Sequence, residues 1–397
     1  MEPLILSKYT LTSAVGCGLK ELEQALLNQQ SGLRPCDLES VDLETCIGRV
    51  EKIEESPVID RLKEFDCRNN RLAQLALQQD DFSRAVEDAK IRYGPERIGL
   101  FLGTSTSGIL ETEIAYRNRD PVTGNLPETF RYIETQNNFS VAAFVQKYFE
   151  LEGPALVICT ACSSSSKVFA EASRFIRSGF CDAAIVGGTD SLCLTTLYGF
   201  SSLELLSSKP CRPADPDRNG LSIGEASGYA LLEKSENGDF QNQIALLGYG
   251  ESSDAYHMTT PPPDGRGMVQ SMEMALECAG LKPDQISYIN LHGTATTTND
   301  SAEDKAVAKV FGSSTPCSST KGWMGHTLGA AGISEAIISA ICLKKNFIPG
   351  SLNTLEIDPG FASNIILKNR EEKLNYVLSN SFGFGGNNCS LIFEVRT

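Results

Sequence analysis

Short apolar runs alternate with helix-type segments along this chain, and the alternation limits the folds that it can adopt. Apolar residues three and four positions apart make residues 71–90, RLAQLALQQDDFSRAVEDAK, a predicted helix. Three apolar runs without that spacing are typical of strands buried on both faces: 97–103, 155–161 and 181–188. Buried strands that alternate with helices predict the α/β fold class.

The same order of elements runs through both halves of the chain. A new series of strands and helices, including the strand ISYINLHG (286–293), follows the polar, turn-rich segment KSENGDFQNQ (234–243). A chain of 397 residues is also too long for one ordinary core. We therefore expect two similar α/β halves, residues 1–240 and 241–397.

Charge and composition exclude several classes of protein. The net charge of −15 argues against nucleic acid or a membrane surface as a partner bound through the field of the whole protein. No apolar run reaches the length of a membrane span and no signal sequence is present, so the expected location is cytoplasmic. The 13 scattered cysteines are then expected to be reduced. Three histidines are too few for a zinc-finger array or a His-rich metal site, and no metal is expected.

Cys162 lies where an apolar strand meets a helix, in LVICTACSSSSKVFAEASRFIRSG (156–179). A thiol in the first turn of a helix lies near unpaired N–H groups and the positive end of the helix dipole, which both favour the nucleophilic thiolate. The small residues around it leave room for a substrate. We interpret Cys162 as a nucleophile; the alternatives are a packed cysteine at a strand end and a redox pair with Cys159.

Two of the three histidines lie in turns rich in glycine and threonine. His292 ends the strand ISYINL, where side chains of α/β folds point into the crevice used for chemistry. His326 lies in TKGWMGHTLGAAG, between Lys321 and Glu335. Both are candidates for catalysis. His257, in a polar, proline-rich loop, is assigned a structural or loop role.

The glycine-rich segment NSFGFGGNN (380–388) predicts a tight turn between two strands. Such a turn can direct a backbone N–H group at a developing oxyanion, or it can be a simple hairpin. The chain contains neither a strand–GxGxxG–helix unit with a downstream acid nor a GxxxxGK[ST] loop. A dinucleotide site and a P-loop are therefore set aside.

Six segments of the chain resemble motifs of the β-ketoacyl-[acyl-carrier-protein] synthases, in the elongating branch that uses one cysteine and two histidines. They follow the family's order: TACSSS, CRPADPDRNGLSIGEASG, SSDAYHMTTPP, HGTATTTND, TKGWMGHTLGAAG and NSFGFGGNN. The first 95 residues match more loosely. The resemblance implies a thiolase-like architecture of two fused α/β halves in five layers, which forms a homodimer.

The resemblance also implies a role for each matching residue. Cys162 would be the acylated nucleophile, so Cys162→Ala is expected to abolish acyl transfer. His292 and His326 would activate a malonyl thioester for loss of CO₂ and stabilise the enolate oxygen, and His326→Ala is expected mainly to slow condensation. Lys321 and Glu335 match a supporting pair that orients and polarises the site.

Other matching residues would bind the substrate. The backbone N–H groups of Cys162 and Phe384 would form an oxyanion hole, and Phe384 resembles the family's gate residue. Thr294 and Thr296 match positions that hydrogen-bond a phosphopantetheine arm. This arm would arrive on an acyl carrier protein, so no separate cofactor is expected.

Two further sets of residues are hypotheses about partner and chain length. An acidic carrier protein would need a local basic patch on this acidic chain. The candidates, for which solvated surface charge is the alternative, are Arg68, Arg71, Lys209 and Arg212. The apolar residues expected to control chain length are Ile109, Phe139 and Phe200.

Three features depart from the pattern common in primary metabolism: Cys159 beside the nucleophile, Asn387 where a threonine is frequent, and a short, divergent N-terminal segment. They leave open a specialised polyene or polyketide substrate, and a heterodimer with a subunit that resembles a chain-length factor. The chain could itself be that non-catalytic partner, but Cys162 argues against this. A degradative thiolase, with Cys389 as its second cysteine, is a third alternative.

Overall fold

The computed structural model describes residues 1–39, 41–234 and 242–396. The expected boundary between residues 240 and 241 lies outside them. Across these described residues, no helix is both long enough and apolar enough to span a membrane.

One large mixed sheet forms the frame of the molecule, and its strand order repeats in the two halves. The order is β1-β9-β7-β5-β6 in the first half and β10-β17-β16-β11-β12 in the second, which β14 extends. In each half the first three strands pair antiparallel and the following strands pair parallel. The antiparallel pair β1 and β10 joins the halves, with Leu4 opposite Leu246. The predicted α/β class with two similar halves is therefore confirmed.

The strands of the first half are β1 (Leu4–Ser13), β5 (Ile98–Gly103), β6 (Ala155–Ile158), β7 (Ala183–Asp190) and β9 (Ala226–Lys234). Those of the second half are β10 (Ile244–Ser253), β11 (Tyr288–Asn290), β12 (Pro316–Ser318), β14 (Asn364–Ile365), β16 (Tyr376–Gly383) and β17 (Asn387–Val395). Short strands form small additional pairings: β2 (Gly16–Cys17), β3 (Leu33–Pro35), β4 (Cys46–Gly48), β8 (Ile223–Gly224), β13 (Phe347–Ile348) and β15 (Arg370–Glu371).

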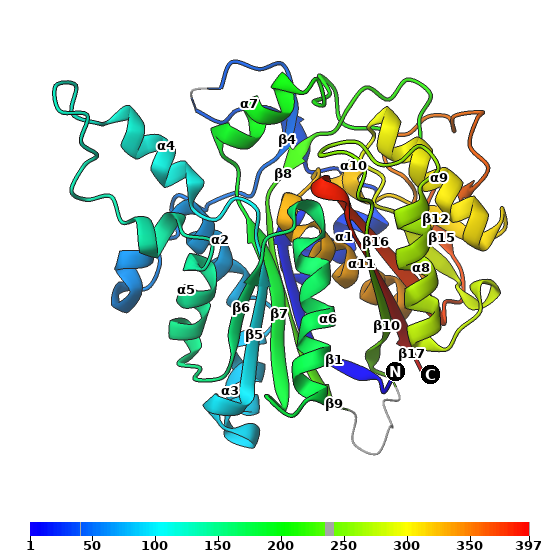
Figure 1. The fold of residues 1–397 in the computed structure, drawn as a ribbon, viewed down its shortest axis with the longest axis horizontal. Coiled ribbons are helices and arrows are strands. Elements are labelled where there is room, and N and C mark those ends of the chain that lie inside the picture. Colours follow the sequence, from blue (N-terminus) through cyan, green and yellow to red (C-terminus); the bar gives the residue numbers. More distant parts are fainter. Residues whose placement is uncertain (40, 235–241, 397) are drawn as a thin grey trace.

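Helices cover the sheet in three layers. Between the two halves, α6 (Ser164–Arg177) and α11 (Ala331–Lys345) bury their apolar residues against strands of both. On the outer face of the first half lie α2 (Arg68–Leu77), α3 (Phe82–Tyr93) and α5 (Ser140–Phe149). On that of the second half lie α8 (Arg266–Ala279) and α9 (Thr297–Phe311). Figure 1 shows these outer groups on opposite sides of the molecule. The expected five layers are present.

The remaining helices lie around the ends of the strands. They are α1 (Leu19–Leu27), α4 (Ile109–Arg117), α7 (Leu194–Ser202) and α10 (Lys321–Met324). Figure 1 shows α4 and the segment after it extending away from the body of the molecule.

The single helix predicted over residues 71–90 is wrong, because the structure breaks it into α2 and α3. Asp80 and Asp81 at the break have φ angles of 53° and 55°, in the left-handed region that a helix cannot use. The Asp80 carboxylate accepts hydrogen bonds from the Thr10 hydroxyl at 2.8 Å and the Leu19 amide at 3.0 Å. Contacts with residues distant in sequence thus stabilise the break.

Candidate active site

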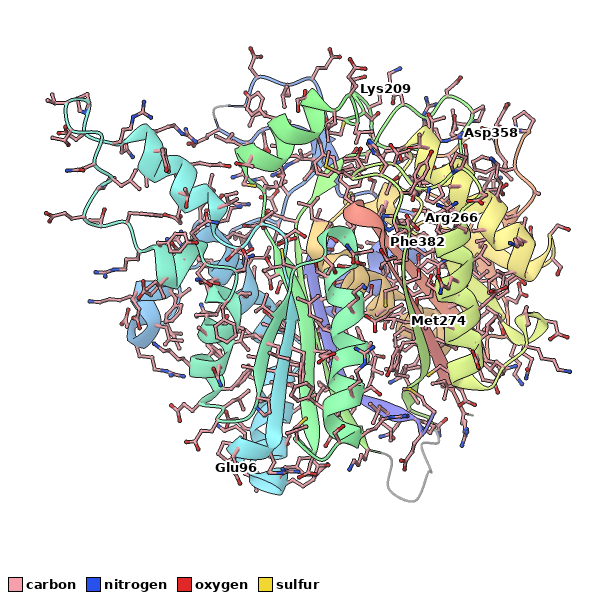
Figure 2. The ribbon with its side chains drawn as sticks, viewed as in Figure 1. Glu96, Lys209, Arg266, Met274, Asp358 and Phe382 are labelled. Carbon is pink, nitrogen blue, oxygen red and sulfur yellow. The ribbon has the colours of Figure 1, made fainter. Side chains whose placement is uncertain are left out.

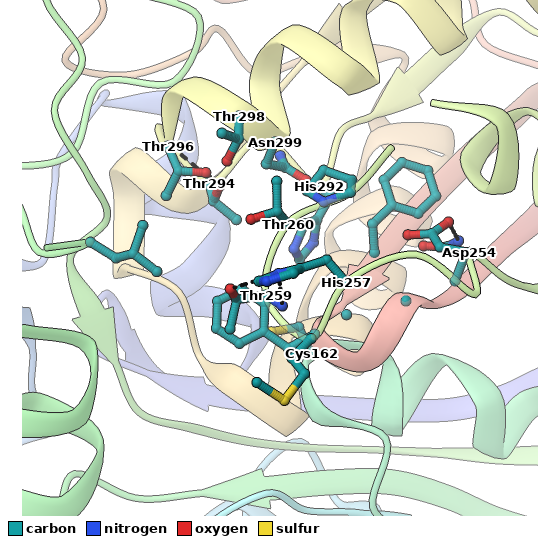
Figure 3. A pocket seen from close by; sticks show the side chains of 18 of the residues that line it. Cys162, Asp254, His257, Thr259, Thr260, His292, Thr294, Thr296, Thr298 and Asn299 are labelled. Atoms are coloured by element: carbon teal, nitrogen blue, oxygen red, sulfur yellow. Dashed lines mark hydrogen bonds between the residues drawn. The ribbon is translucent and has the colours of Figure 1, made fainter. Parts of the chain in front are cut away.

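A cavity lies where the carboxyl ends of strands from both halves meet. It encloses about 560 Å³ including its open mouth. Figure 3 shows Cys162 and His292 in it together with the threonines of two loops. Predicted site residues that line the cavity are Cys162, Phe200, His292, Thr294, Thr296, His326 and Phe384.

The turn that carries Cys162 is held by its small neighbours. A single 3₁₀ turn, Ala161–Ser163, links β6 to α6. Ala161 has a φ of 52°, an unfavourable value for a residue with a Cβ atom. The Ser164 hydroxyl accepts a hydrogen bond from the Thr160 amide at 2.9 Å and donates one to the Ala161 carbonyl at 2.6 Å. The run of serines therefore closes a strained turn that places the thiol at the cavity.

The expectation that the helix start makes Cys162 anionic is not met in the free chain. Burial raises the pKa of the Cys162 thiol to about 11, although Lys321 and the backbone N–H of Phe384 act to lower it. The cost of removing a thiolate from water exceeds the gain from these groups. At neutral pH the resting side chain is a neutral thiol that needs a proton acceptor.

His326 provides an acceptor beside the thiol. Its Nε2 atom lies 2.9 Å from the Cys162 sulfur. The turn that carries His326 is fixed by its backbone, whose N–H donates to the Ser222 carbonyl at 2.7 Å and whose carbonyl accepts from the Gly224 amide at 2.9 Å.

His292 completes the group from the second half of the sheet. Its ring meets that of His326 edge to face, with centroids 5.3 Å apart. Potential ligand atoms of Cys162 and both histidines lie within 4.8 Å of one another. The Glu303 carboxylate fixes the loop by accepting hydrogen bonds from the His292 amide at 2.8 Å and the Gly293 amide at 2.7 Å.

Both imidazoles are neutral near pH 7. Burial lowers the pKa of His292 and of His326 well below the ordinary value, and the charge of Lys321 lowers both further. A neutral imidazole carries one N–H donor and one acceptor nitrogen. The pair can therefore donate hydrogen bonds to a developing oxyanion, and either ring can accept a proton.

One thiol and two imidazoles are also ligands that zinc accepts. Here the Lys321 ammonium lies 3.4 Å from the Nδ1 atom of His292. A second cation in this space would meet strong repulsion in a buried environment. The donor set therefore fits acyl chemistry better than a metal.

Lys321 and Glu335 lie behind His292 and form an ion pair. The Lys321 ammonium also donates a hydrogen bond to the His292 carbonyl, which fixes the backbone just after β11. The second carboxylate oxygen of Glu335 accepts a bond from the Ser381 hydroxyl at 3.5 Å. Burial raises the pKa of Glu335 to about 7, with Lys321 acting in the opposite direction.

The structure brings together some of the predicted substrate contacts. The hydroxyl groups of Thr294 and Thr296 lie 2.9 Å apart on the loop after β11. Phe200 stacks on Phe384, with ring centroids 5.6 Å apart and ring planes at 25°. The Phe200 side chain thus comes from α7 to meet the glycine-rich turn at the cavity.

Ile109 and Phe139 do not belong to this group. Ile109 begins α4, Phe139 precedes α5, and neither lines the cavity among the described residues. A role of these two residues in chain length stays a prediction.

Of the four residues expected to form a basic patch, the structure corrects Arg68, and the patch itself stays a prediction. Arg68 is buried, and its guanidinium bonds the Glu225 carboxylate, with Nε to Oε2 at 3.0 Å, and that of Glu54. It cannot present a free charge to a partner. Arg71 is half-buried and paired with Asp66 at 2.6 Å.

The other two basic candidates lie nearer the surface. Arg212 is half-buried and donates to the Asp217 carbonyl at 3.1 Å. Lys209 is exposed, as Figure 2 also shows.

Sequence reasoning missed the loop between β10 and α8 as part of the site. His257, assigned a loop role, lines the cavity together with Met258 and Thr259. The loop is tied to the glycine-rich turn, because the Gly385 amide donates to the Met258 carbonyl at 2.6 Å. The sequence signal for this loop is the motif SSDAYHMTTPP (252–262), which contains all three residues.

Known proteins resemble this chain in sequence and in fold. The β-ketoacyl synthase N-terminal domain matches residues 10–238, and the β-ketoacyl synthase C-terminal domain matches residues 244–355. The chain is 31% identical to the 3-oxoacyl-[acyl-carrier-protein] synthase 2 of Vibrio cholerae, over 97% of each sequence.

Two solved structures extend the comparison. One is a chain from a ketosynthase in complex with its chain length factor, from Xenorhabdus doucetiae. It has 39% identity and a TM-score of 0.89, and the match covers 99% of this chain and 98% of that one. The other, from the ishigamide ketosynthase/chain length factor, has 25% identity and a TM-score of 0.88 over the full length of both chains.

Proposed function

This chain belongs to the β-ketoacyl synthase family, and we propose that Cys162, His292 and His326 are the residues with which it condenses acyl thioesters. The chain is an acyltransferase of the 3-oxoacyl-[acyl-carrier-protein] synthase type. The observation that carries the residue assignment is the 2.9 Å contact between the Cys162 sulfur and the His326 Nε2 atom inside the cavity.

The first step is acyl transfer to the enzyme. The Cys162 sulfur attacks the carbonyl carbon of an acyl thioester, while His326 Nε2 accepts the thiol proton. A sulfur–carbon bond forms to Cys162, and the bond to the carrier's thiol breaks. The proton then passes to the departing thiolate. Because Cys162 is protonated at rest, His326 supplies the activation that the helix start alone does not.

The second step uses the same cavity for a malonyl thioester. Loss of CO₂ leaves the electrons of the broken carbon–carbon bond in an enolate, whose oxygen accepts N–H hydrogen bonds from His292 and His326. The enolate carbon then attacks the carbonyl carbon of the acyl group on Cys162. The new carbon–carbon bond forms, and the Cys162 sulfur leaves as a thiolate. No strong base is needed, because the donors stabilise charge where it develops.

The remaining assignments concern how the substrate is held. We assign Thr294 and Thr296 to the phosphopantetheine arm, which arrives as part of the carrier-bound substrate. Phe384 is assigned to the gate and its backbone N–H, with that of Cys162, to the oxyanion hole. Lys321 and Glu335 are assigned to the support of His292. Their position on the cavity wall or directly behind it supports these roles.

We further propose a specialised substrate and a heterodimer with a subunit of the chain-length-factor type. The support is the nearly full-length likeness to a chain of a ketosynthase solved with its chain length factor. The presence of Cys162 makes this chain the catalytic member. We retain, also as proposals, a cytoplasmic location and the division at 240/241, on either side of which the two matched domains fall.

The test is to incubate the purified chain with acyl carrier proteins that bear saturated, polyene or polyketide acyl groups, plus malonyl carrier. Mass spectrometry then identifies the products, with Cys162→Ala as control. If the purified protein, as a homodimer without a second subunit, efficiently extends a saturated acyl group, the proposal of a specialised heterodimer is rejected. Products formed only after a chain-length-factor-type subunit is added would support it.

A further inference from the structure

A carboxylate with no cationic partner is buried next to the two reacting turns. Asp190 ends β7 and is fully buried, and no Lys or Arg lies within 4 Å of it across the described part of the chain. Burying a carboxylate without a cation is costly unless hydrogen bonds replace its hydration. Its Oδ1 atom accepts bonds from the Thr104 hydroxyl at 2.6 Å, the Ser105 amide at 2.8 Å, the Thr106 amide at 2.9 Å and the Thr106 hydroxyl at 2.8 Å.

One arm of this network leads to the nucleophile. Ser105 bonds both sides: its amide donates to the Asp190 carboxylate, and its hydroxyl donates to the Ala161 carbonyl at 3.1 Å. Ala161 is the strained residue directly before Cys162, with φ at 52°. Such strain persists only where surrounding contacts hold it.

The other arm leads to His326. The Oδ2 atom of Asp190 accepts a bond from the Gly329 amide at 2.6 Å. Gly329 follows Leu328, which has a φ of 54° and lies two residues after His326. A second strained turn therefore depends on the same carboxylate.

The two arms meet with no spare room. A Cβ atom on Gly329 would lie 2.7 Å from both the Asp190 Oδ2 atom and the Ser105 nitrogen. The turns after β5 and after His326 thus approach each other closely, with the carboxylate between them.

We propose that Asp190 is a positioning residue that holds Cys162 and His326 at their working separation, through Ser105 on one side and Gly329 on the other. The inference rests on the function proposed above for those two residues. All five groups around the carboxylate are donors, so the ionised form satisfies each of them. An error of about 1 Å in such a pair can cost about a hundredfold in rate.

A purely structural role for Asp190 makes a different prediction. In that case its loss would destabilise the fold around β7 and expose neighbouring cysteines, without a selective effect on acyl transfer. Positioning, by contrast, affects the reaction that needs both Cys162 and His326, and spares a reaction that needs the sulfur alone.

The test compares Asp190→Asn with Thr189→Val in the full chain. Asparagine keeps the shape of the side chain but replaces one carboxylate oxygen with an NH₂ group. This donor then faces an N–H or O–H group that donates to Asp190 in the wild type, and that hydrogen bond is lost. Thr189 is the buried neighbour whose hydroxyl bonds Ser227 at 2.7 Å and takes no part in the network. Three quantities are measured: acyl loading of Cys162 from an acyl carrier substrate, alkylation of each cysteine by iodoacetamide, and the thermal midpoint.

For Asp190→Asn we expect acyl loading about ten- to a hundredfold slower than in the Thr189→Val chain. Alkylation of Cys162 should not slow, and its pH profile should move to lower pH, because Asp190 raises the pKa of that thiol. The buried Cys181 and Cys317 should stay unmodified. Equal rates of acyl loading in the two variants overturn the proposal. So does a slower loading of Asp190→Asn that is accompanied by alkylation of the buried cysteines.

Ser105→Ala decides the matter if Asp190→Asn does not fold. It removes only the hydroxyl bond to Ala161, and loading about fivefold slower is expected. Unchanged loading would overturn the arm to Cys162. If the wild-type chain acquires no acyl group on Cys162, the proposed function fails; if it does and the variants match it, only the positioning inference fails.

Discussion

Lys321 and Glu335 form an ion pair that is almost fully removed from water, with side-chain exposures of 3% and 4%. Lys321 is the first residue of α10, and Glu335 lies within α11. The Lys321 ammonium also donates a hydrogen bond to the His292 carbonyl. The pair therefore connects the stability of the fold with the placement of His292.

Breaking this pair should be costly. Lys321→Met leaves the Glu335 carboxylate buried without its cation, and a loss of about 3–5 kcal/mol in the free energy of unfolding is expected. Urea unfolding measures it. Arg97→Met serves as the control, because the Arg97–Asp182 pair is one-third exposed and screened by water, so its loss should change the free energy of unfolding much less. Equal effects of the two substitutions would contradict the assigned role.

The reactivity of Cys162 should depend on pH in a defined direction. Its pKa of about 11 means that the thiolate is a small fraction at neutral pH and grows as pH rises. Alkylation of the Cys162 peptide by iodoacetamide should therefore accelerate throughout pH 7 to 10, by up to about tenfold per pH unit. A rate that levels off near pH 8 would show a thiolate stabilised in the free chain.

The two histidines should affect the two steps differently. His292→Ala leaves the contact between Cys162 and His326 in place, so acyl loading should continue while condensation falls about a hundred- to a thousandfold. His326→Ala should slow both steps, and not mainly condensation as the sequence alone suggests, because it removes the proton acceptor beside Cys162 as well as a donor. Single-turnover assays of each step separate these effects. The control is Thr189→Val, at a buried residue outside the cavity lining, and equal losses in all three variants would reject the assignment.

Neutral burial of His326 should also make stability depend on pH. Its pKa in the folded chain lies below the ordinary value, so as pH falls through about 6.5 the unfolded chain binds a proton that the folded chain does not. That contribution to stability is lost toward low pH. His326→Gln cannot take up the proton. Relative to wild type, it should gain roughly 1 kcal/mol between pH 6.5 and 5.5 in urea unfolding, and an unchanged difference would contradict neutral burial.

The reacting group could be predicted from sequence because its chemistry is local. Cys162, His292 and His326 each lie at a strand end or in a glycine-rich turn, and such positions converge at one edge of an α/β sheet. The alternation of buried strands and helices similarly predicts the class of fold.

The features that could not be predicted from the sequence depend on contacts between residues far apart in the chain. In the sequence Arg68 is one of several basic residues, and only the fold shows that it faces Glu225, 157 positions away, and is unavailable to a partner. The break between α2 and α3 at Asp80 depends on Thr10 of β1. The protonated state of Cys162 follows from burial by residues of both halves, which no local pattern encodes.

The most direct measurement is the mass of the chain after exposure to an acyl carrier substrate alone, followed by mapping of the modified peptide. A single sulfur that attacks thioesters predicts one added acyl group, located on Cys162, and an unmodified mass for Cys162→Ala. An acyl group that still attaches to the Cys162→Ala chain would contradict the account.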